Sequence, residues 1–340
     1  MNFYLIGIDH NSAALEVREA VHRKRKAIET FLAAYRFGVY ALLSTCNRIE
    51  VYVASANARE AYVRTRLFLR HFPEFSKYGY AETKSEHVLR HLVRLSAGLE
   101  SEIKGETQIL EQLDSLHSEH SFPEGLFRLW HDAIRLGRYI RLEAGLNDGG
   151  RNIAAAVFDD IFKHVDHDRR IEIAVIGTGS VASLFALNGR PEARISFIAN
   201  KNHRKAKELA LLANGKAFSL EALPDILLTR DVIISATKSP HFILKDGLPG
   251  AIAGRKGPLY IYDLAVPRDI DPKIGRIDGI ILKDIEDLKD SFKEYNRKIE
   301  DRLCLAEYIT EEAVKHNAEN IDDTEITPGF AAKQIGNNAG

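Results

Sequence analysis

IEIAVIGTGSVA, residues 171–182, is the stretch that decides the fold of this 340-residue chain. Its first half is an apolar run typical of a buried strand, and its second half is a Gly-x-Gly-x-x-Ala sequence that opens a helix. In such a strand–turn–helix the glycines let the backbone approach a pyrophosphate, whose charge the helix N-terminus attracts. We therefore predict a dinucleotide site formed by Gly177, Thr178, Gly179, Ser180, Val181 and Ala182.

The pattern after this stretch predicts the architecture of the second half of the chain. A strand at 194–199 and a helix at 203–213 follow, and apolar runs at 232–234, 259–262 and 279–282 supply further short strands. Strands that alternate with helices are typical of a parallel, doubly wound sheet. We predict an α/β Rossmann-type domain.

The residues after the second predicted strand indicate which nucleotide binds. A site for NAD places Asp or Glu there to bond the ribose 2′-hydroxyl. This chain instead has Asn200 and Lys201, followed by the further cationic or titratable side chains His203, Arg204 and Lys205. A neutral residue followed by cations fits a 2′-phosphate, so Asn200 and Lys201 predict NADPH rather than NADH. A Rossmann-like domain without a nucleotide is the alternative.

The first half of the chain has a different pattern. Strand patterns occur at 3–8, 39–44 and 51–54, with a helix at 24–36 between them, and helical periodicity then dominates as far as residue 163. This pattern predicts an α+β N-terminal domain with helical extensions. The turn sequence Asn147-Asp148-Gly149-Gly150 separates the two halves.

We divide the chain into an N-terminal domain at 1–148, the Rossmann-type domain at 149–284, a C-terminal helix at 285–316 and a tail at 317–340. Cys304 lies next to the apolar row of that helix, so we expect it to be structural. The tail is polar and aperiodic, so we expect it to be disordered.

The segment Leu43-Ser44-Thr45-Cys46-Asn47-Arg48-Ile49-Glu50 places a thiol directly after an apolar strand. The thiolate is the reactive form of cysteine, and a nearby cation such as Arg48 lowers the pKa of a thiol. A nucleophilic cysteine indicates covalent catalysis on an acyl group. The alternative is a buried structural cysteine.

Charge and cysteine content exclude several classes of protein. The chain has 47 basic and 48 acidic residues, whereas a protein that coats nucleic acid is normally basic, so we expect no DNA partner. No run approaches about 18 apolar residues, and the N-terminus lacks a basic segment, so we expect neither a membrane span nor a signal peptide. Two distant cysteines without C-x-x-C spacing predict no metal site and a cytoplasmic location.

A candidate nucleophile and a nicotinamide site in one chain predict the reduction of an activated acyl group. Cys46 would form a thioester, and hydride from NADPH would reduce that thioester to an aldehyde. Direct reduction of a free carboxylate is much harder, so the substrate should arrive already activated.

Several short motifs occur together between residues 3 and 315. They are Gly7-Ile8-Asp9-His10, Arg18-Glu19, Ser44-Thr45-Cys46-Asn47-Arg48 with Glu50 and Tyr52, His91-Leu92, Gly98-Leu99-Glu100-Ser101, Gly105-Glu106-Thr107-Gln108-Ile109-Leu110 with Gln112, the glycine sequence at 177–182, Ala199-Asn200, Ile234-Ser235-Ala236-Thr237, and the run from Asp263 to Pro272. In these motifs the chain resembles the glutamyl-tRNA reductases, which open the five-carbon route to tetrapyrroles. The Ser-Thr-Cys-Asn-Arg and Ala-Val-Pro-Arg-Asp sequences are the most specific of them.

The resemblance implies NADPH-dependent reduction of glutamyl-tRNA(Glu) to glutamate-1-semialdehyde, the first step of 5-aminolevulinate and porphyrin biosynthesis. It implies that Cys46 is the nucleophile and that His91 polarises or positions groups at the thioester. It also implies that Arg48 binds the side-chain carboxylate of the substrate and that Glu106 binds its α-ammonium group. The implied substrate-binding residues are Thr45, Asn47, Arg48, Ser101, Glu106, Thr107, Gln108 and Gln112. The implied partners are glutamyl-tRNA(Glu) and glutamate-1-semialdehyde aminomutase, the next enzyme of the pathway.

The chain departs from the family pattern at a few positions. Thr107 and Ala14 stand where the family has proline, and Asn152 stands where it has a serine that contacts the glutamate. The pattern of the family's C-terminal dimerisation domain does not occur after residue 316, so we expect a monomer or a weak dimer.

Two other functions are compatible with the sequence. One is a non-catalytic relative of glutamyl-tRNA reductase that regulates haem synthesis, against which the retention of Cys46, His91 and the glycine sequence argues. The other is a different Rossmann reductase, acting on a quinate-like compound or a porphyrin precursor, in which the Cys46 segment would have no purpose.

Overall fold

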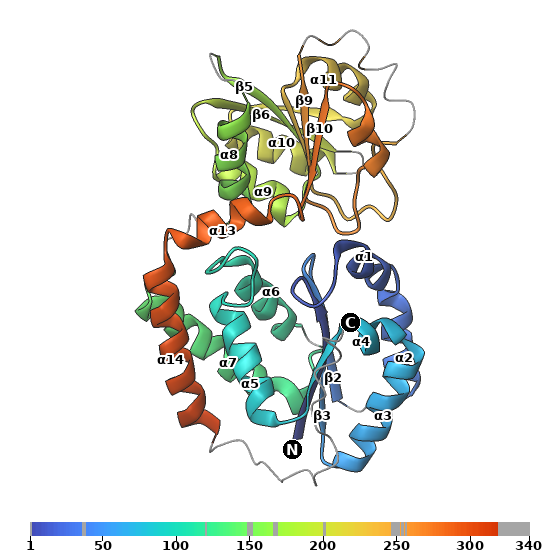
Figure 1. The fold of residues 1–340 in the computed structure, drawn as a ribbon, viewed down its shortest axis with the longest axis vertical. Helices are drawn as coiled ribbons and strands as arrows, with labels where there is room; N and C mark the ends of the chain where they lie inside the picture. The colour runs from blue at the N-terminus through green and yellow to red at the C-terminus, as the bar shows by residue number, and fades with distance from the viewer. Residues whose placement is uncertain are drawn as a thin grey trace, which may run out of the picture. The chain divides into compact units, whose positions relative to one another are not determined.

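The computed structural model describes residues 2–35, 39–119, 121–147, 152–165, 169–199, 202–245, 252, 255 and 257–318. These residues form two units, which are drawn in Figure 1. Unit 1 contains the described residues up to 147 together with those from Asn296 onward, and unit 2 contains those from 152 to Tyr295.

Unit 1 is built on an antiparallel sheet in the strand order β2-β3-β1-β4. Its strands are β1 (Asn2–Asp9), β2 (Val39–Ser44), β3 (Arg48–Ser55) and β4 (Tyr80–Glu82). Strands β2 and β3 form a hairpin in which Ser44 pairs with Ile49. This register places Cys46 in the turn at the end of the sheet.

Helices cover both faces of this sheet, as Figure 1 shows. The helices of unit 1 are α1 (Leu15–Arg23), α2 (Arg25–Ala34), α3 (Ala58–His71), α4 (Pro73–Tyr78), α5 (Ser85–Ala97), α6 (Gln108–His117), α7 (Glu124–Glu143) and α14 (Glu300–Ala318). Of these, α6 and α14 pack against α5 and α7. Successive residues of a strand point to opposite faces. On β1, Leu5 accordingly joins a core cluster with residues of α5 and α7, whereas Tyr4 and Ile6 join a second cluster with residues of α2 and α3.

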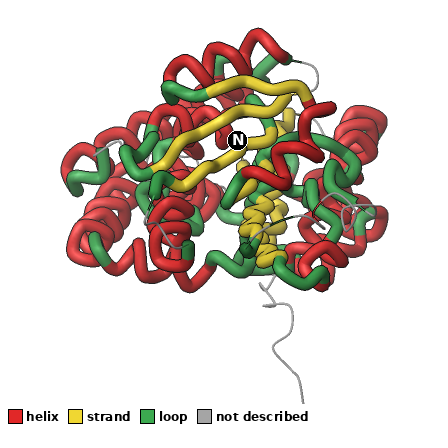
Figure 2. The backbone as a smooth tube through the Cα atoms, turned by 90° about the horizontal axis from the view of Figure 1, so that it is seen from above, coloured by secondary structure: helices red, strands yellow, loops and turns green. Residues whose placement is uncertain are grey.

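Unit 2 is a parallel six-stranded sheet in the order β10-β9-β8-β5-β6-β7, with helices around the strands (Figure 2). Its strands are β5 (Ile171–Ile176), β6 (Ala193–Ala199), β7 (Lys216–Ser219), β8 (Val232–Ser235), β9 (Leu259–Asp263) and β10 (Ile280–Asp284). Its helices are α8 (Ile153–His164), α9 (Ser180–Leu187), α10 (His203–Leu212), η1 (Leu220–Ala222), α11 (Leu223–Thr229), η2 (Pro272–Arg276) and α13 (Lys289–Arg297), of which the last two residues belong to unit 1. Counted within the unit, the strand order is the 3-2-1-4-5-6 of a Rossmann fold, in which the ligand binds between the first and fourth strands.

The structure confirms both predicted fold classes but corrects several predicted elements. The helix predicted at 24–36 is the second of two helices, α1 and α2, that meet at Lys24. The short strands β4 and β7 were not predicted. Each lies at the edge of its sheet and pairs with one neighbour. Each is also too short to show a clear alternation of apolar and polar residues in the sequence.

The single C-terminal helix predicted at 285–316 is also wrong, because α13 and α14 are separate helices. Near the end of α13, the side chain of Asn296 accepts a hydrogen bond from Lys104 N (3.0 Å) and donates one to Glu102 O (2.8 Å). The chain then turns into α14, which packs against α5 and α7. Cys304 is exposed on α14, so its expected structural role is not supported.

The predicted tail lies outside the described residues from 319 onward, as does the predicted domain boundary at 148–149. Of the helices that the structure describes, none has the length and apolar character needed to cross a bilayer.

Candidate active site

Cys46 lies in the turn between β2 and β3. Thr45 N donates to Arg48 O (2.9 Å) and closes the turn, and Asn47 N donates to Thr45 Oγ1 (3.2 Å). Cys46 as a whole residue is partly exposed. The prediction that the thiol comes directly after an apolar strand is confirmed, since β2 ends at Ser44.

Helix α1 holds this turn from the side. Arg18 Nη1 donates to Cys46 O (3.5 Å) and to Asn47 Oδ1 (3.4 Å). One helical turn later, His22 hydrogen bonds to the backbone of Thr45. The sequence argument missed both contacts. The only signal in the sequence was the Arg18-Glu19 motif, and this motif does not indicate which residues Arg18 contacts.

The surroundings of Cys46 raise the pKa of its thiol to about 12. Burial is the largest cause and the negative charges of Glu106 and Glu102 add to it, whereas the charge of Arg18 acts in the opposite direction. The expectation that Arg48 lowers the pKa of this thiol is therefore wrong. Arg48 is not among the main causes of the shift, and its Nη1 instead contacts a carboxylate inside the sheet.

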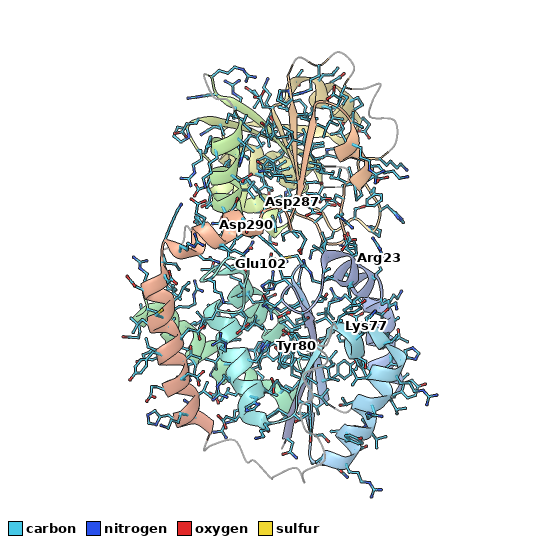
Figure 3. The ribbon with its side chains drawn as sticks, in the orientation of Figure 1. Arg23, Lys77, Tyr80, Glu102, Asp287 and Asp290 are labelled. Carbon is cyan, nitrogen blue, oxygen red and sulfur yellow. The ribbon has the colours of Figure 1, made fainter. Side chains whose placement is uncertain are left out.

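That carboxylate is Glu50, the centre of a buried network on the face of β3 toward α5. It accepts hydrogen bonds from Arg48 Nη1 (2.8 Å), Tyr52 OH (2.5 Å), Tyr80 OH (2.5 Å) and His91 Nε2 (2.9 Å). The two-residue period of a strand puts Arg48, Glu50 and Tyr52 on one face. Figure 3 shows Tyr80 among the side chains in the interior of unit 1.

The network holds the ring of His91 through its Nε2 atom. Burial by itself raises the pKa of Glu50, but the charges of His91 and Arg48 and the hydrogen bonds to the carboxylate lower it overall. An ionised carboxylate only accepts hydrogen bonds, so Nε2 of His91 is the donor in this contact and Nδ1 is the other ring nitrogen. Among the described contacts, none joins His91 to Cys46.

The segment between α5 and α6, residues 98–107, carries several predicted substrate-binding residues. The side chain of Ser101 hydrogen bonds to Glu106, and Arg48 Nη2 donates to Glu100 O. Burial raises the pKa of Glu106 to about 7, although the Ser101 bond and the charge of Arg48 act against it. The structure thus brings Ser101, Glu106 and Arg48 together near the Cys46 turn.

Arg141 of α7 anchors this segment. Its fully buried guanidinium donates to the carbonyl oxygens of Ala97 (3.1 Å), Glu106 (2.8 Å), Gly105 (3.0 Å) and Leu146 (2.9 Å). The backbone carbonyl groups of a buried loop need hydrogen-bond donors, which in a helix or sheet are backbone N–H groups. Here the side chain of Arg141 supplies these donors. The path of the segment that carries Ser101 and Glu106 therefore depends on Arg141.

The remaining predicted substrate residues lie on α6. Thr107 precedes its first turn, and Gln108 and Gln112 are partly exposed one turn apart, on the same face. No described hydrogen bond joins them to the Cys46 turn. Within the part of the chain that the structure describes, no group of three or more His, Cys, Asp or Glu could hold a metal ion.

The departures from the family pattern have local explanations. Ala14 has a φ of −61°, which is the angle that proline imposes, so the backbone path does not need the proline ring. Asn152 is buried in unit 2, where its side chain accepts from Ala155 N (3.1 Å) and caps α8. Its described role is thus that of a helix cap.

The residues predicted to hold the nucleotide lie where β5 ends. Gly177 has a φ of +118°, and a Cβ there would lie 2.5 Å from Ala236 O, so only glycine fits. Gly179 is the N-cap of α9, and a Cβ there would meet no protein atom closer than 3.9 Å. The missing side chain leaves open space over the helix N-terminus. These residues therefore fit a bound pyrophosphate.

Two aspartates shape the loops beside this site. Asp269 accepts from Ser235 Oγ (2.7 Å), Thr237 N (2.9 Å) and Thr237 Oγ1 (2.6 Å), which fixes the chain after β8. Asp263 accepts from Ala265 N (3.1 Å) and Ile270 N (2.9 Å). Strands β8 and β5 are neighbours, so the loop after β8, which Asp269 holds at Thr237, lies directly beside Gly177.

Of the residues predicted to select the nucleotide, Asn200 and Lys201 lie outside the described residues. His203, Arg204 and Lys205 begin α10, and Arg204 forms an exposed ion pair with Glu208 (3.0 Å). Such an exposed pair is weak, so it would not keep Arg204 from a phosphate.

Gly179→Ala is expected to weaken dinucleotide binding at least about tenfold without changing the melting temperature, because the added methyl group enters the space above α9 but clashes with no protein atom. Titration of the cofactor by fluorescence measures the affinity. Gly189→Ala is the matched control, since a Cβ at Gly189 also meets nothing closer than 3.9 Å. Equal affinity of the two variants would place the pyrophosphate elsewhere.

Comparison with known proteins finds one family profile for each unit. The profile described as "Glutamyl-tRNAGlu reductase, N-terminal domain" matches residues 6–144, and the one described as "Shikimate / quinate 5-dehydrogenase" matches residues 159–291. A different Rossmann reductase does not account for the first match, which includes Cys46 and His91.

Curated relatives match almost the whole chain. The glutamyl-tRNA reductase of Carboxydothermus hydrogenoformans is 33% identical over 96% of this chain and 73% of its own length. That of Thermus thermophilus is 35% identical over 84% of this chain and 72% of its own. Among solved structures, the glutamyl-tRNA reductase of Methanopyrus kandleri aligns with 94% of this chain and 80% of its own, with 25% identity and a TM-score of 0.49.

A doubly wound dinucleotide unit and a second unit with a thiol at its sheet end define an oxidoreductase that uses a nicotinamide cofactor. The matches over both units narrow this class further. The chain belongs to the glutamyl-tRNA reductase family.

Proposed function

We propose that this protein catalyses the NADPH-dependent reduction of glutamyl-tRNA(Glu) to glutamate-1-semialdehyde through a thioester on Cys46, the first step of 5-aminolevulinate and porphyrin biosynthesis. One observation carries the proposal: Cys46, a partly exposed residue, lies in a turn at a sheet end, with Glu102 and Glu106 close enough to act on the charge of its thiol. The relatives are glutamyl-tRNA reductases, which supports the choice of substrate.

In the first half of the reaction, the sulfur of Cys46 attacks the carbonyl carbon of the ester that joins glutamate to the tRNA. A carbon–sulfur bond forms, the carbon–oxygen bond breaks, and the tRNA leaves as the alcohol after taking up a proton. In the second half, a hydride and a proton convert the thioester into the aldehyde and the original thiol. NADPH, when bound, supplies the hydride.

We assign the recognition of the glutamyl group to side chains around the turn. The carboxylate of Glu106 would pair with the α-ammonium. Arg48 has five N–H donors, of which its described hydrogen bonds use two, so it can still donate to the side-chain carboxylate. His91, held through Nε2 by Glu50, would position groups at the thioester through Nδ1. The pocket is completed by Thr45, Asn47, Ser101, Thr107, Gln108 and Gln112.

NADPH is our choice over NADH because Asn200 and Lys201 offer no carboxylate to a 2′-hydroxyl and His203, Arg204 and Lys205 follow. Titration with both cofactors tests this choice. We expect NADPH to bind at least about tenfold more tightly, since a 2′-phosphate gains charged hydrogen bonds that NADH lacks. Tighter binding of NADH would overturn the assignment.

A single-turnover assay with charged tRNA and NADPH tests the reaction, with the aldehyde as the product to be measured. The same mixture without NADPH, quenched in acid, should show a glutamyl adduct on Cys46 by mass spectrometry. A chain that binds glutamyl-tRNA but gives neither adduct nor aldehyde would instead be the non-catalytic regulator. Glutamate-1-semialdehyde aminomutase is a proposed partner, because the aldehyde product is reactive and the next enzyme would have to convert it quickly.

The KM for glutamyl-tRNA is expected to fall as the pH rises through about 7, the raised pKa of Glu106. Below this pH the carboxyl is protonated and cannot attract an ammonium group, and above it the carboxylate can. Steady-state kinetics between about pH 6 and pH 8 checks the trend, which the variant Glu106→Gln should abolish. The same slope in the variant would remove Glu106 from ammonium binding.

A further inference from the structure

The contacts of Arg18 set it apart among the cations of unit 1. Its side chain is almost completely buried, with 2% of its surface exposed. One guanidinium nitrogen, Nη1, reaches the carbonyl oxygen of Cys46 and the side-chain oxygen of Asn47. Because the first acceptor belongs to Cys46 itself, the positive charge lies beside the residue that carries the thiol.

We propose that Arg18 is the positioning residue of the Cys46 turn, and that its buried charge stabilises the thiolate. The inference deepens the proposed function, because that function is what gives the thiolate its role. Arg18 does not touch the substrate in this account. It acts through Cys46, which it holds in place from α1.

Arg48, the more obvious candidate from the sequence, cannot have this role. It is as buried as Arg18, but its Nη1 lies 2.8 Å from Glu50 Oε1, in the network that also holds His91. Its charge acts on Glu106, but it is not among the main charges that act on the thiol of Cys46. The neighbouring positions of Cys46 and Arg48 in the sequence therefore do not translate into an electrostatic effect on the thiol.

The other charged or titratable groups that face Cys46 come from two elements. From α1, His22 bonds the backbone of Thr45, and its pKa is lowered to about 4, first by burial, so it is neutral at pH 7. From the segment after α5, Glu102 and Glu106 add negative charge, which disfavours a thiolate. Arg18 is the charged side chain whose effect opposes them. Removal of its charge should therefore make the thiolate scarcer.

Alkylation of Cys46 by iodoacetamide tests the proposal without any substrate. Because only the thiolate reacts, the rate at a fixed pH below the thiol pKa measures the thiolate fraction. The neutral reagent is not attracted by Arg18, and Cys304→Ser in every protein removes the exposed second cysteine. Arg18→Gln keeps a hydrogen-bond donor but loses the charge, whereas Arg18→Lys keeps the charge but loses the planar guanidinium.

We expect Arg18→Gln to react about tenfold more slowly than the parent, since the loss of an adjacent charge moves a pKa by about one pH unit or more. Arg18→Lys should stay within about threefold of the parent. Two results overturn the proposal: a rate for Arg18→Gln equal to that of the parent, or equal slowing in both variants at unchanged melting temperature. The second would make Arg18 purely structural.

Substitution of a buried arginine can prevent folding, so a second variant keeps the test decisive. Asn47→Ala removes one of the two acceptors of Arg18 in the turn and leaves every charge in place. We expect alkylation about two- to threefold slower, because the guanidinium is held less closely to the turn. If both Arg18 variants fail to fold, an unchanged rate in Asn47→Ala overturns the proposal.

These outcomes are separate from those of the proposed function. Alkylation needs neither tRNA nor NADPH, so it reports on Arg18 even if no glutamyl adduct ever forms. Conversely, an adduct in the parent together with an unchanged alkylation rate in Arg18→Gln would uphold the reaction and remove Arg18 from it.

Discussion

Cys46→Ser is expected to lower aldehyde formation at least about 1,000-fold, because a hydroxyl is a far weaker nucleophile than a thiolate and gives an ester in place of a thioester. The residue is partly exposed in a turn, and the substitution exchanges one atom. The fold and the nucleotide unit should therefore be unaffected. Binding of NADPH and of glutamyl-tRNA should stay within about twofold of the parent.

Single-turnover formation of the aldehyde, measured beside a fluorescence titration of NADPH, checks both halves of this expectation. Cys304→Ser is the matched control, since Cys304 is the other cysteine, is exposed and lies on α14. The control should turn over like the parent. Normal turnover by Cys46→Ser would remove the thioester mechanism altogether.

Arg141→Met is expected to destabilise unit 1 by about 3–5 kcal/mol, because it leaves four carbonyl groups without the donor that they share. In a unit of this size such a loss lowers the melting temperature by about 10 °C. It should also abolish turnover, since the segment that carries Ser101 and Glu106 loses its anchor.

Trp130 makes this measurement specific to unit 1. It is the only tryptophan of the chain, lies on α7 and is buried, so its fluorescence follows the melting of this unit alone. Arg138→Met, one helical turn earlier, is the matched control. Arg138 is exposed and pairs with Asp114 (2.8 Å), so its loss should cost less than about 0.5 kcal/mol. Equal melting temperatures for the two variants would mean that Arg141 does not anchor the segment.

The sequence predicted what depends on neighbours along the chain. The apolar run before Gly177 and the helix after it are set by local pattern, and the Gly177 angle and the close approach of Ala236 require glycine there. The exit of the chain from the sheet at Thr45 is likewise local, since an apolar strand ends where polar residues begin.

What depends on tertiary contact was missed or wrongly predicted. Arg48 is two residues from Cys46, yet it belongs to a network that also needs Tyr80 and His91 from distant parts of the chain. Arg18 is 28 residues away and contacts the turn directly. Periodicity gives the face of an element on which a side chain lies but not its partner across the core. A local motif likewise does not predict how far the thiol is buried, and this burial is what raises its pKa.

Unit 1 is assembled from two stretches of chain with the whole of unit 2 between them. Ala306 and Val314 of α14 fill the core cluster that α5 and α7 share. During synthesis on a ribosome, the nucleotide-binding half can therefore fold before the half that carries Cys46 is complete. Until the last helix emerges, apolar surface on α5 and α7 faces water. A chain that stops short of α14 should bind the cofactor yet aggregate through its unfinished half.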